Sequence, residues 1–183
     1  KCILFCTLIT TLTLNNVSGG SSPPSVLYSD EAVIPSVIRY DLSFLSDVPE
    51  KYHQFFESWQ YGYDPIYIFA IVTVESQWDE KAVGAINNNG SHDIGLTQLN
   101  SKYIEYFVAR YLSDAESFDP YDGMDSLSLA AQHLDYLMDK TDNVYHAIAA
   151  YNVGLYGFQS KQVRRDAAYY ILKVKGAIYE TQW

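Results

Sequence analysis

The apolar stretch at residues 66–74 constrains the fold more than any other part of the sequence, because it has no polar face. A helix that is hydrophobic all round has to be buried. Asp64 and Pro65 precede the stretch as an N-cap followed by proline at the first helical position, an arrangement that starts helices. A buried central strand is the rival interpretation, since Ile68 and residues 71–74 are β-branched and periodicity alone does not separate the two. The capping signature and the length favour a buried helix.

Other segments repeat apolar side chains at helical spacing, which predicts further helices. The first lies within residues 47–62, the second follows Ser101 as its predicted N-cap, and three more lie further along the chain. Their apolar residues are Tyr52, Phe55, Phe56 and Trp59; Ile104, Phe107, Val108, Tyr111 and Leu112; Leu127, Ala130, Ala131, Leu134, Leu137 and Met138; Val144, Ala147 and Ile148; and Val163, Ala167, Tyr170, Ile171 and Val174. We predict a predominantly all-α fold with its helices around one cleft. Asn88, Asn89 and Gly90 predict a short turn or small β-ribbon in the loop between residues 84 and 95.

The N-terminal residues have the order of a secretory signal. Lys1 is followed by an apolar run and then by small and polar residues up to Gly19, so we expect a leader at residues 1–19. The run is too short to span a membrane, which takes about 20 apolar residues, although an uncleaved leader would still tether the protein. Residues 20–46 are rich in Gly, Ser and Pro at their start and are expected to form a linker or ancillary arm. The domain itself is expected at residues 47–183.

Charge and cysteine content exclude several classes of function. The formal net charge of −10 would repel a phosphate backbone, so we expect no nucleic-acid partner. Cys2 and Cys6 are the only cysteines and lie within the expected leader, which leaves the remaining chain without a disulfide. The histidines, at positions 53, 92, 133 and 146, lack metal-ligand spacing. We expect no metal site.

Glu75 follows the apolar stretch directly. A carboxyl group held among apolar neighbours has a raised pKa, because loss of water disfavours its charged form. Such a carboxyl is a proton donor of the kind that glycoside cleavage requires. The plain alternative is an exposed glutamate at a helix end.

Two further motifs accompany Glu75 and Ser76, namely Gly-Leu-Thr-Gln at residues 95–98 and Ala-Tyr-Asn-Val-Gly at residues 150–154. In order and spacing the three segments resemble the catalytic domain of the soluble lytic transglycosylases, over roughly residues 48–178. Thr97 and Val153 stand where that family usually has methionine and alanine. Residues 87–100 are most similar to the small invasion- and conjugation-associated members.

The resemblance implies a lysozyme-like fold and cleavage of the β-1,4 bond between N-acetylmuramic acid and N-acetylglucosamine, with a 1,6-anhydro product and no cofactor. It gives Glu75 the role of acid and then base, and places Ser76 beside it to orient the acid or the substrate. Gln98 and Asn152 would bind sugar substituents, and Tyr151 and Tyr170 would line the cleft. Gly95, Leu96, Asn100 and Ala150 complete the expected substrate-binding set. Asp166 and Ala167 replace the family's glutamate and threonine before Tyr170.

Two alternatives stay open. A hydrolytic muramidase of the same fold would use two carboxylates, and Asp79, Glu80 and Asp93 are the nearest candidates, although turn formation explains them equally well. Goose-type lysozymes look like relatives that hydrolyse the same bond, and they have an acid where this chain has Asn100. This difference favours transglycosylation. A non-catalytic protein that binds the cell wall is the second alternative, suggested by Thr97 and Ala167.

The leader and the resemblance together indicate a monomeric protein that is exported to the periplasm. Its expected partners are the glycan strands of peptidoglycan and a secretion or cell-wall machine that would recruit it.

Overall fold

The computed structural model describes residues 38–112, 117–159 and 164–181. The expected leader, the arm before residue 38 and Val163 of the last apolar stripe lie outside this range. The described elements are the 3-10 helices η1 (Ser43–Asp47) and η2 (Glu50–Tyr52), the helices α1 (His53–Glu57), α2 (Ile66–Glu75), α3 (Ile104–Tyr111), α4 (Gly123–Lys140), α5 (Val144–Val153), α6 (Leu155–Gln159) and α7 (Arg164–Glu180), and the strands β1 (Asp93–Ile94) and β2 (Leu99–Asn100). The predominantly all-α fold class is confirmed.

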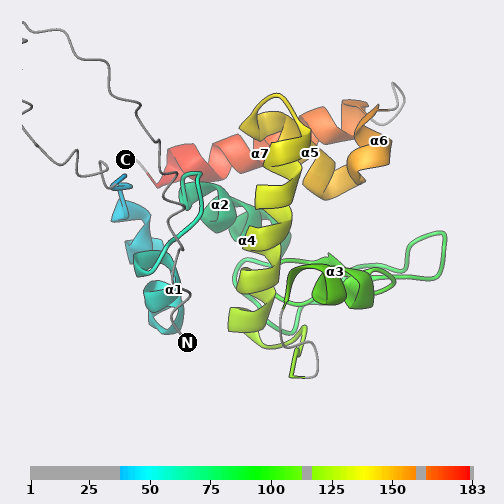
Figure 1. The fold of residues 1–183 in the computed structure, drawn as a ribbon, viewed down its shortest axis with the longest axis horizontal. Helices are drawn as coiled ribbons and strands as arrows, with labels where there is room; N and C mark the ends of the chain where they lie inside the picture. The colour runs from blue at the N-terminus through cyan, green and yellow to red at the C-terminus, as the bar shows by residue number, and fades with distance from the viewer. Residues whose placement is uncertain (1–37, 113–116, 160–163, 182–183) are drawn as a thin grey trace, which may run out of the picture. The chain divides into compact units, whose positions relative to one another are not determined.

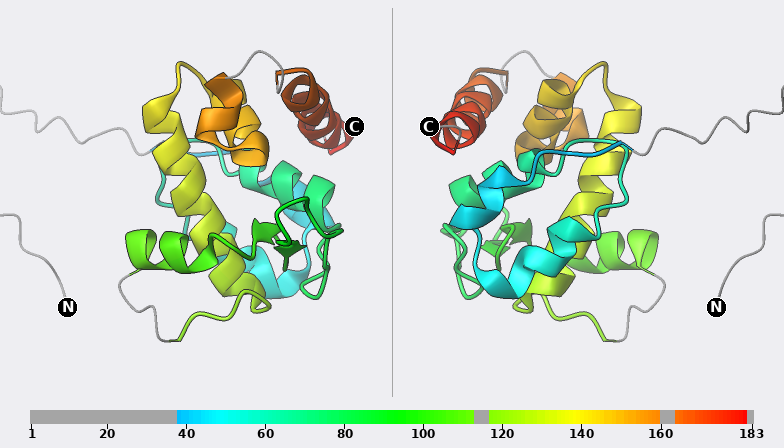
Figure 2. Two further views of the ribbon diagram at one scale, coloured as in Figure 1. Left: turned by 90° about the vertical axis from the view of Figure 1, so that its right-hand side faces the viewer. Right: turned by 90° about the vertical axis from the view of Figure 1, so that its left-hand side faces the viewer.

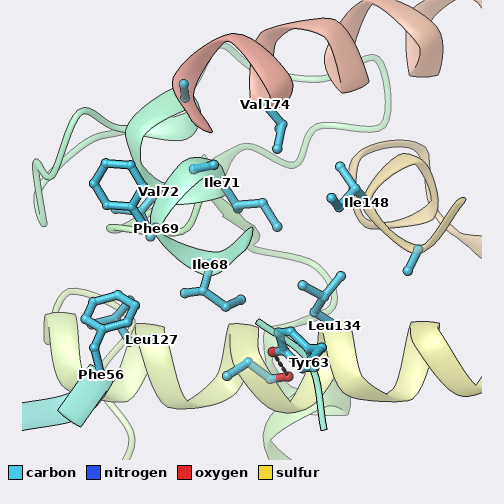
Figure 3. Close-up of a cluster of buried hydrophobic side chains, with 14 of the residues drawn as sticks. Phe56, Tyr63, Ile68, Phe69, Ile71, Val72, Leu127, Leu134, Ile148 and Val174 are labelled. Atoms are coloured by element: carbon cyan, nitrogen blue, oxygen red, sulfur yellow. Dashed lines mark hydrogen bonds between the residues drawn. The ribbon is translucent and has the colours of Figure 1, made fainter. Parts of the chain in front are cut away.

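Helix α2 is the buried helix predicted from the apolar stretch, and the strand interpretation is wrong. Its residues from Ile68 to Val72 are almost completely buried. Figure 3 shows side chains of α2 directed towards Val174 of α7 and Ile148 of α5, and on another side towards Leu134 of α4. Because other helices cover α2 on several sides, it needs no polar face.

Both ends of α2 are set by local backbone chemistry. At the start, the Asp64 carboxylate accepts a hydrogen bond of 3.0 Å from the Ile66 amide, with Pro65 rather than Asp64 at the N-cap position. At the end, Gln77 and Trp78 have φ angles of 53° and 69°. This left-handed conformation does not continue an α-helix, so the helix ends and Glu75 lies in its last turn.

The helices C-terminal to the ribbon form a series in which α5 contacts both α4 and α7, and α3 contacts α4. Figures 1 and 2 show α5 between α4 and α7, with α3 beside α4. Asp122 caps α4 by accepting hydrogen bonds from the amides of Met124 and Asp125 at 2.9 and 3.1 Å, and Asn143 caps α5 by accepting one from His146 at 3.1 Å. These caps satisfy amides that the helices leave unpaired.

The predicted turn forms at the Asn and Gly cluster and a small β-ribbon follows it, but the predicted cap of α3 is wrong. Strands β1 and β2 pair antiparallel, with Asp93 opposite Asn100, and the Gly90 amide closes a turn onto the carbonyl of Asn87 at 2.9 Å. Helix α3 begins at Ile104 without a side-chain cap. Ser101 instead accepts a hydrogen bond of 3.1 Å from the His92 amide, and so fixes the ribbon rather than the helix.

The packed part of the domain begins before the boundary expected at Asp47. Phe44 in η1 is only 1% exposed, and its ring lies 5.3 Å from that of Phe56 and 5.1 Å from that of Phe69. The end of the expected ancillary arm therefore contributes to the core. A large aromatic ring buries much apolar surface, even in a segment without regular spacing.

Among the described residues, no helix combines the length and the apolar character that crossing a membrane requires.

We predict that Phe44→Ala destabilises the domain by about 3–5 kcal/mol, the usual effect of truncating a buried phenylalanine. Urea unfolding of the wild type and the variant measures this difference. Ser43→Ala changes an exposed neighbour and is the matched control, with little effect expected. Equal stability of the Phe44 variant and the control would show that this segment does not contribute to the core.

Candidate active site

Glu75 lies at the C-terminal end of α2 and is held by α7. The Tyr170 hydroxyl donates a hydrogen bond of 2.6 Å to Glu75 Oε1. Burial raises the pKa of Glu75 to about 7; the Tyr170 hydrogen bond lowers it, the nearby charge of Asp93 raises it, and Lys173 lowers it. Burial also raises the pKa of Tyr170 well above its ordinary value, so its hydroxyl remains a donor. The carboxyl group of Glu75 is therefore partly protonated at neutral pH.

A cavity of about 250 Å³ lies between the ribbon and the helices α3, α4 and α5. Its lining residues are Asn87, Asp93, Gln98, Leu99, Asn100, Tyr103, Phe107, His133, Tyr151, Asn152 and Gly154. Glu75 is not itself a lining residue but lies close to two of them: the charge of Asp93 raises the pKa of Glu75, and Glu75 contributes to the raised pKa of Tyr151. The cavity combines amides, one carboxylate and aromatic rings beside a protonatable acid.

Asp93 enters the cavity from the ribbon, opposite Asn100. The Asn100 side-chain amide donates hydrogen bonds to Asp93 Oδ1 at 2.8 Å and to Ser91 Oγ at 3.0 Å. A neutral amide at position 100 can donate to a carboxylate, whereas an acid there would place two like charges together. Asn100 thus fixes Asp93 and lines the cavity at the same time.

Ser76 and Gln98, expected to contact the acid or the sugar, instead hold the loop that carries the second motif. Ser76 Oγ donates to the Leu96 carbonyl at 2.6 Å. The Gln98 side-chain amide donates to the carbonyls of Gly95 and Ala82 at 2.9 and 3.2 Å. Gln98 also borders the cavity, but its NH₂ group already has two backbone partners.

Gly95 has a structural role. Its φ is +76°, and a Cβ atom at this position would overlap the Pro120 carbonyl oxygen. Only glycine fits both the left-handed backbone and the close approach of the segment before α4. This contact joins the motif loop to the start of α4.

Leu96 and Ala150, expected in the substrate-binding set, are buried in the core instead of lining the cavity. Both residues are 0% exposed, since Leu96 lies in the core cluster around α2 and Ala150 on the inner face of α5. Apolar residues inside a motif are as easily explained by packing as by binding. Their role is to hold the neighbouring motif residues in place.

The remaining predicted residues surround the cavity and Glu75. Tyr151 lines the cavity, and its hydroxyl donates to the Thr97 carbonyl at 3.1 Å. Asn152 also lines the cavity and is exposed. Tyr170 is 6% exposed and contacts Glu75 rather than the cavity.

Thr97, which departs from the family pattern, has a partner of its own. Its hydroxyl lies 2.8 Å from the hydroxyl of Ser126 in α4, and both residues are 0% exposed. A buried hydroxyl without a partner would be costly. Ser126 therefore satisfies the buried hydroxyl of Thr97.

Two of the three candidate second carboxylates have structural roles. Asp79 Oδ1 accepts a hydrogen bond of 2.9 Å from the Lys81 amide. Glu80 accepts one of 3.2 Å from the Gly123 amide, one of 2.5 Å from the Tyr52 hydroxyl, and pairs with Lys51 at 2.9 Å. Only Asp93 lines the cavity.

Several cavity residues are not predicted as such by the sequence. Asp93 alternates with the buried Ile94 along β1, a pattern that indicates a polar face but is equally explained by a turn. Helical spacing assigns Phe107 to the core. From the sequence, His133 is considered only as a possible metal ligand. Within the described segments, no three side chains of the metal-ligating types converge.

Comparison with models of known protein families gives one match. The transglycosylase SLT domain matches residues 54–172, more than half of the chain. Curated proteins give no match. The matched range contains Glu75, the ribbon, all residues that line the cavity and Tyr170.

We predict that Gly95→Ala destabilises the domain by about 3 kcal/mol or more, through backbone strain and the clash with the Pro120 carbonyl. Gly90→Ala is the matched control, because Gly90 has a φ of +81° but no atom within 4 Å of the position that a Cβ would take. The control should lose only about 1 kcal/mol. Chemical denaturation of both variants measures the difference, and equal losses would contradict a role for the clash.

We also predict that Glu75→Gln stabilises the folded protein at pH 8 by roughly 2–3 kcal/mol. The native pKa of about 7 exceeds the reference value of 4.5, so between these values the folded state keeps a proton that the unfolded state has lost. Wild-type stability therefore falls as the pH rises through this range, whereas glutamine does not ionise.

Urea unfolding at pH 4 and pH 8 tests this prediction. The advantage of Glu75→Gln should disappear at pH 4, where both states of the wild type are protonated. Glu57→Gln, at an exposed helix end, is the control and should show no comparable pH dependence. An advantage for Glu75→Gln of the same size at both pH values would argue against buried ionisation as its cause.

Proposed function

Because the chain belongs to the transglycosylase SLT domain family, whose members degrade peptidoglycan, we propose that it is a lytic transglycosylase that cleaves the β-1,4 bond between N-acetylmuramic acid and N-acetylglucosamine. The proposed product is a 1,6-anhydro-muramoyl end. The observation that carries this proposal is the acid Glu75, with a pKa of about 7, close to residues of a cavity lined with amides and aromatic rings.

The protonation of Glu75 suits the first step. A general acid is most effective when its pKa lies near the working pH, and the pKa of Glu75 is about 7. Tyr170 occupies Oε1, whereas Oε2 has no hydrogen-bond partner among the described residues. Oε2 is therefore the oxygen that would carry and donate the proton.

In the proposed reaction, Glu75 protonates the glycosidic oxygen as the bond from that oxygen to C1 of the muramoyl residue breaks. The acetamido group of the same sugar would assist this departure. The C6 hydroxyl then forms a new bond to C1 and returns its proton to Glu75. No water is consumed, and the acid regains its starting form.

Asp93 supplies the second charge that the reaction would use. Positive charge develops at C1 in the transition state of glycoside cleavage, and a fixed carboxylate nearby stabilises it. Asn100 holds Asp93 through a hydrogen bond of 2.8 Å, so that the carboxylate needs no reorganisation.

A hydrolytic muramidase is the second candidate, and Asp93 is the residue that favours it. Ordinary glycosidases use a pair of carboxylates, and Asp93 lines the cavity close enough for its charge to raise the pKa of Glu75. If Asp93 activated water or attacked C1, the product would carry a reducing end. The two functions differ in product rather than in fold.

We further propose that the protein acts outside the cytoplasmic membrane as an exported periplasmic enzyme. Peptidoglycan lies there, and the sequence of residues 1–19 has the order of a secretory signal. Recruitment by a secretion or cell-wall machine, and a monomeric state, belong to the same proposal.

Digestion of purified peptidoglycan, with mass spectrometry of the released muropeptides, tests the function. We predict anhydro-ended products from the wild type and a loss of at least about 100-fold in rate for Glu75→Gln, because general acid catalysis typically contributes 10²–10⁴-fold. Glu57→Gln should retain the wild-type rate.

Other outcomes would identify the alternatives. Reducing ends in place of anhydro ends, lost in Asp93→Asn, would identify a muramidase. Binding to peptidoglycan without any released product would favour a non-catalytic protein. Full activity of Glu75→Gln would overturn both enzymatic proposals.

A further inference from the structure

His133 is the one imidazole that borders the cavity within the described part of the chain. It projects from α4 towards α3, where its ring centroid lies 4.4 Å from that of Phe107 and 5.8 Å from that of Tyr111. On the other side it lies 5.6 Å from the ring of Tyr151. The aromatic neighbours fix the plane of the imidazole at the wall of the cavity.

The two ring nitrogens of His133 have different surroundings. Nδ1 lies 3.2 Å from the Tyr111 hydroxyl, whereas Nε2 has no hydrogen-bond partner among the described residues. The same residues contain no buried side-chain nitrogen or oxygen that lacks a partner. Nε2 is therefore reached by solvent, and His133 is one of the residues that line the cavity.

The imidazole is neutral under the conditions in which Glu75 changes its protonation. Burial, together with the positive charge of Arg110, lowers the pKa of His133 to about 4. A neutral imidazole offers one donor and one acceptor. If the Tyr111 hydroxyl donates to Nδ1, the hydrogen lies on Nε2, which becomes a donor without a partner among the described residues.

The surroundings of Nε2 define the group that would bind there. Phe107 and Leu99 line the same cavity and offer apolar surface, while Nε2 offers a single donor. An acetamido group has the complementary character, because its carbonyl oxygen accepts a hydrogen bond and its methyl group is apolar. A free amine has neither a carbonyl oxygen that accepts from Nε2 nor a methyl group for the apolar surface, so its binding in this cavity would depend on the Asp93 carboxylate instead.

We propose that His133 is a specificity-determining residue that recognises the acetamido group of an N-acetylated sugar, through a hydrogen bond from Nε2 to its carbonyl oxygen. The inference rests on the proposed function in taking a glycan as the ligand. It goes beyond that function by assigning the selection of N-acetylated over deacetylated glycan to one side chain.

Calorimetric binding of two oligosaccharides tests the proposal. The probes are the tetramer of N-acetylglucosamine and its fully deacetylated counterpart, and the protein carries Glu75→Gln so that neither is cleaved. His133→Phe keeps an aromatic ring but has no donor, and should lower the affinity ratio of the acetylated to the deacetylated tetramer by about 3–10-fold, the usual range for one hydrogen bond. Because each ratio uses the same two ligands, their charge difference cancels between variants.

Two further variants separate recognition from packing. His133→Gln has a side-chain amide that can take the place of Nε2 as a donor, and should recover part of the lost selectivity. His146→Phe changes a histidine outside the cavity and should leave the ratio unchanged. Circular dichroism and thermal melting of each variant establish that it is folded before its binding is compared.

The proposal is overturned if His133→Phe weakens both oligosaccharides equally, if it leaves the ratio unchanged, or if neither tetramer binds the parent protein at millimolar concentration. A failure of the proposed function looks different. In that case peptidoglycan digestion gives no anhydro ends, while the acetyl selectivity and its dependence on His133 persist.

Discussion

A helix without a polar face can exist in water only if other elements enclose it, and α2 imposes this requirement on the whole domain. Helices α4, α5 and α7 and the aromatic side chains of η1 and α1 supply the enclosure. The same enclosure surrounds the last turn of α2, where Glu75 lies, so the packing that stabilises the core also removes the carboxyl group from water. The core and the raised pKa of Glu75 thus have one physical cause.

The motifs act on the site mainly through their backbones. Ser76 and Gln98 bind carbonyl groups of the loop at residues 82–96, and Gly95 allows that loop to touch the segment before α4. The side chains that remain available to a ligand are those at the edge of this framework, such as Asp93 and Asn152. In this chain the motif residues lie near Glu75 and the cavity, but several of them bind the backbone of the loop and so hold the site in place.

Sequence patterns predicted the features that depend on residues close together in the chain. The buried helix, the turn at the Asn and Gly cluster and the position of Glu75 all follow from composition and spacing along the chain. Contacts between distant segments were not predictable in this way. Nothing near Leu96 indicates that its side chain points into the core, and nothing near His133 indicates that α3 places Phe107 and Tyr111 against it. Phe44 was missed because one buried ring in an irregular segment has no periodicity.

The pairing of Glu75 with Tyr170 joins residues that are 95 positions apart. Helix α2 is synthesised before α7, so a growing chain carries the acid without its partner until residue 170 has been added. Only when α7 has docked does the carboxyl group gain the hydrogen bond that occupies Oε1 and the cover that removes it from water. The site can therefore form only after α7 has been synthesised, later than the elements that make up the core around α2.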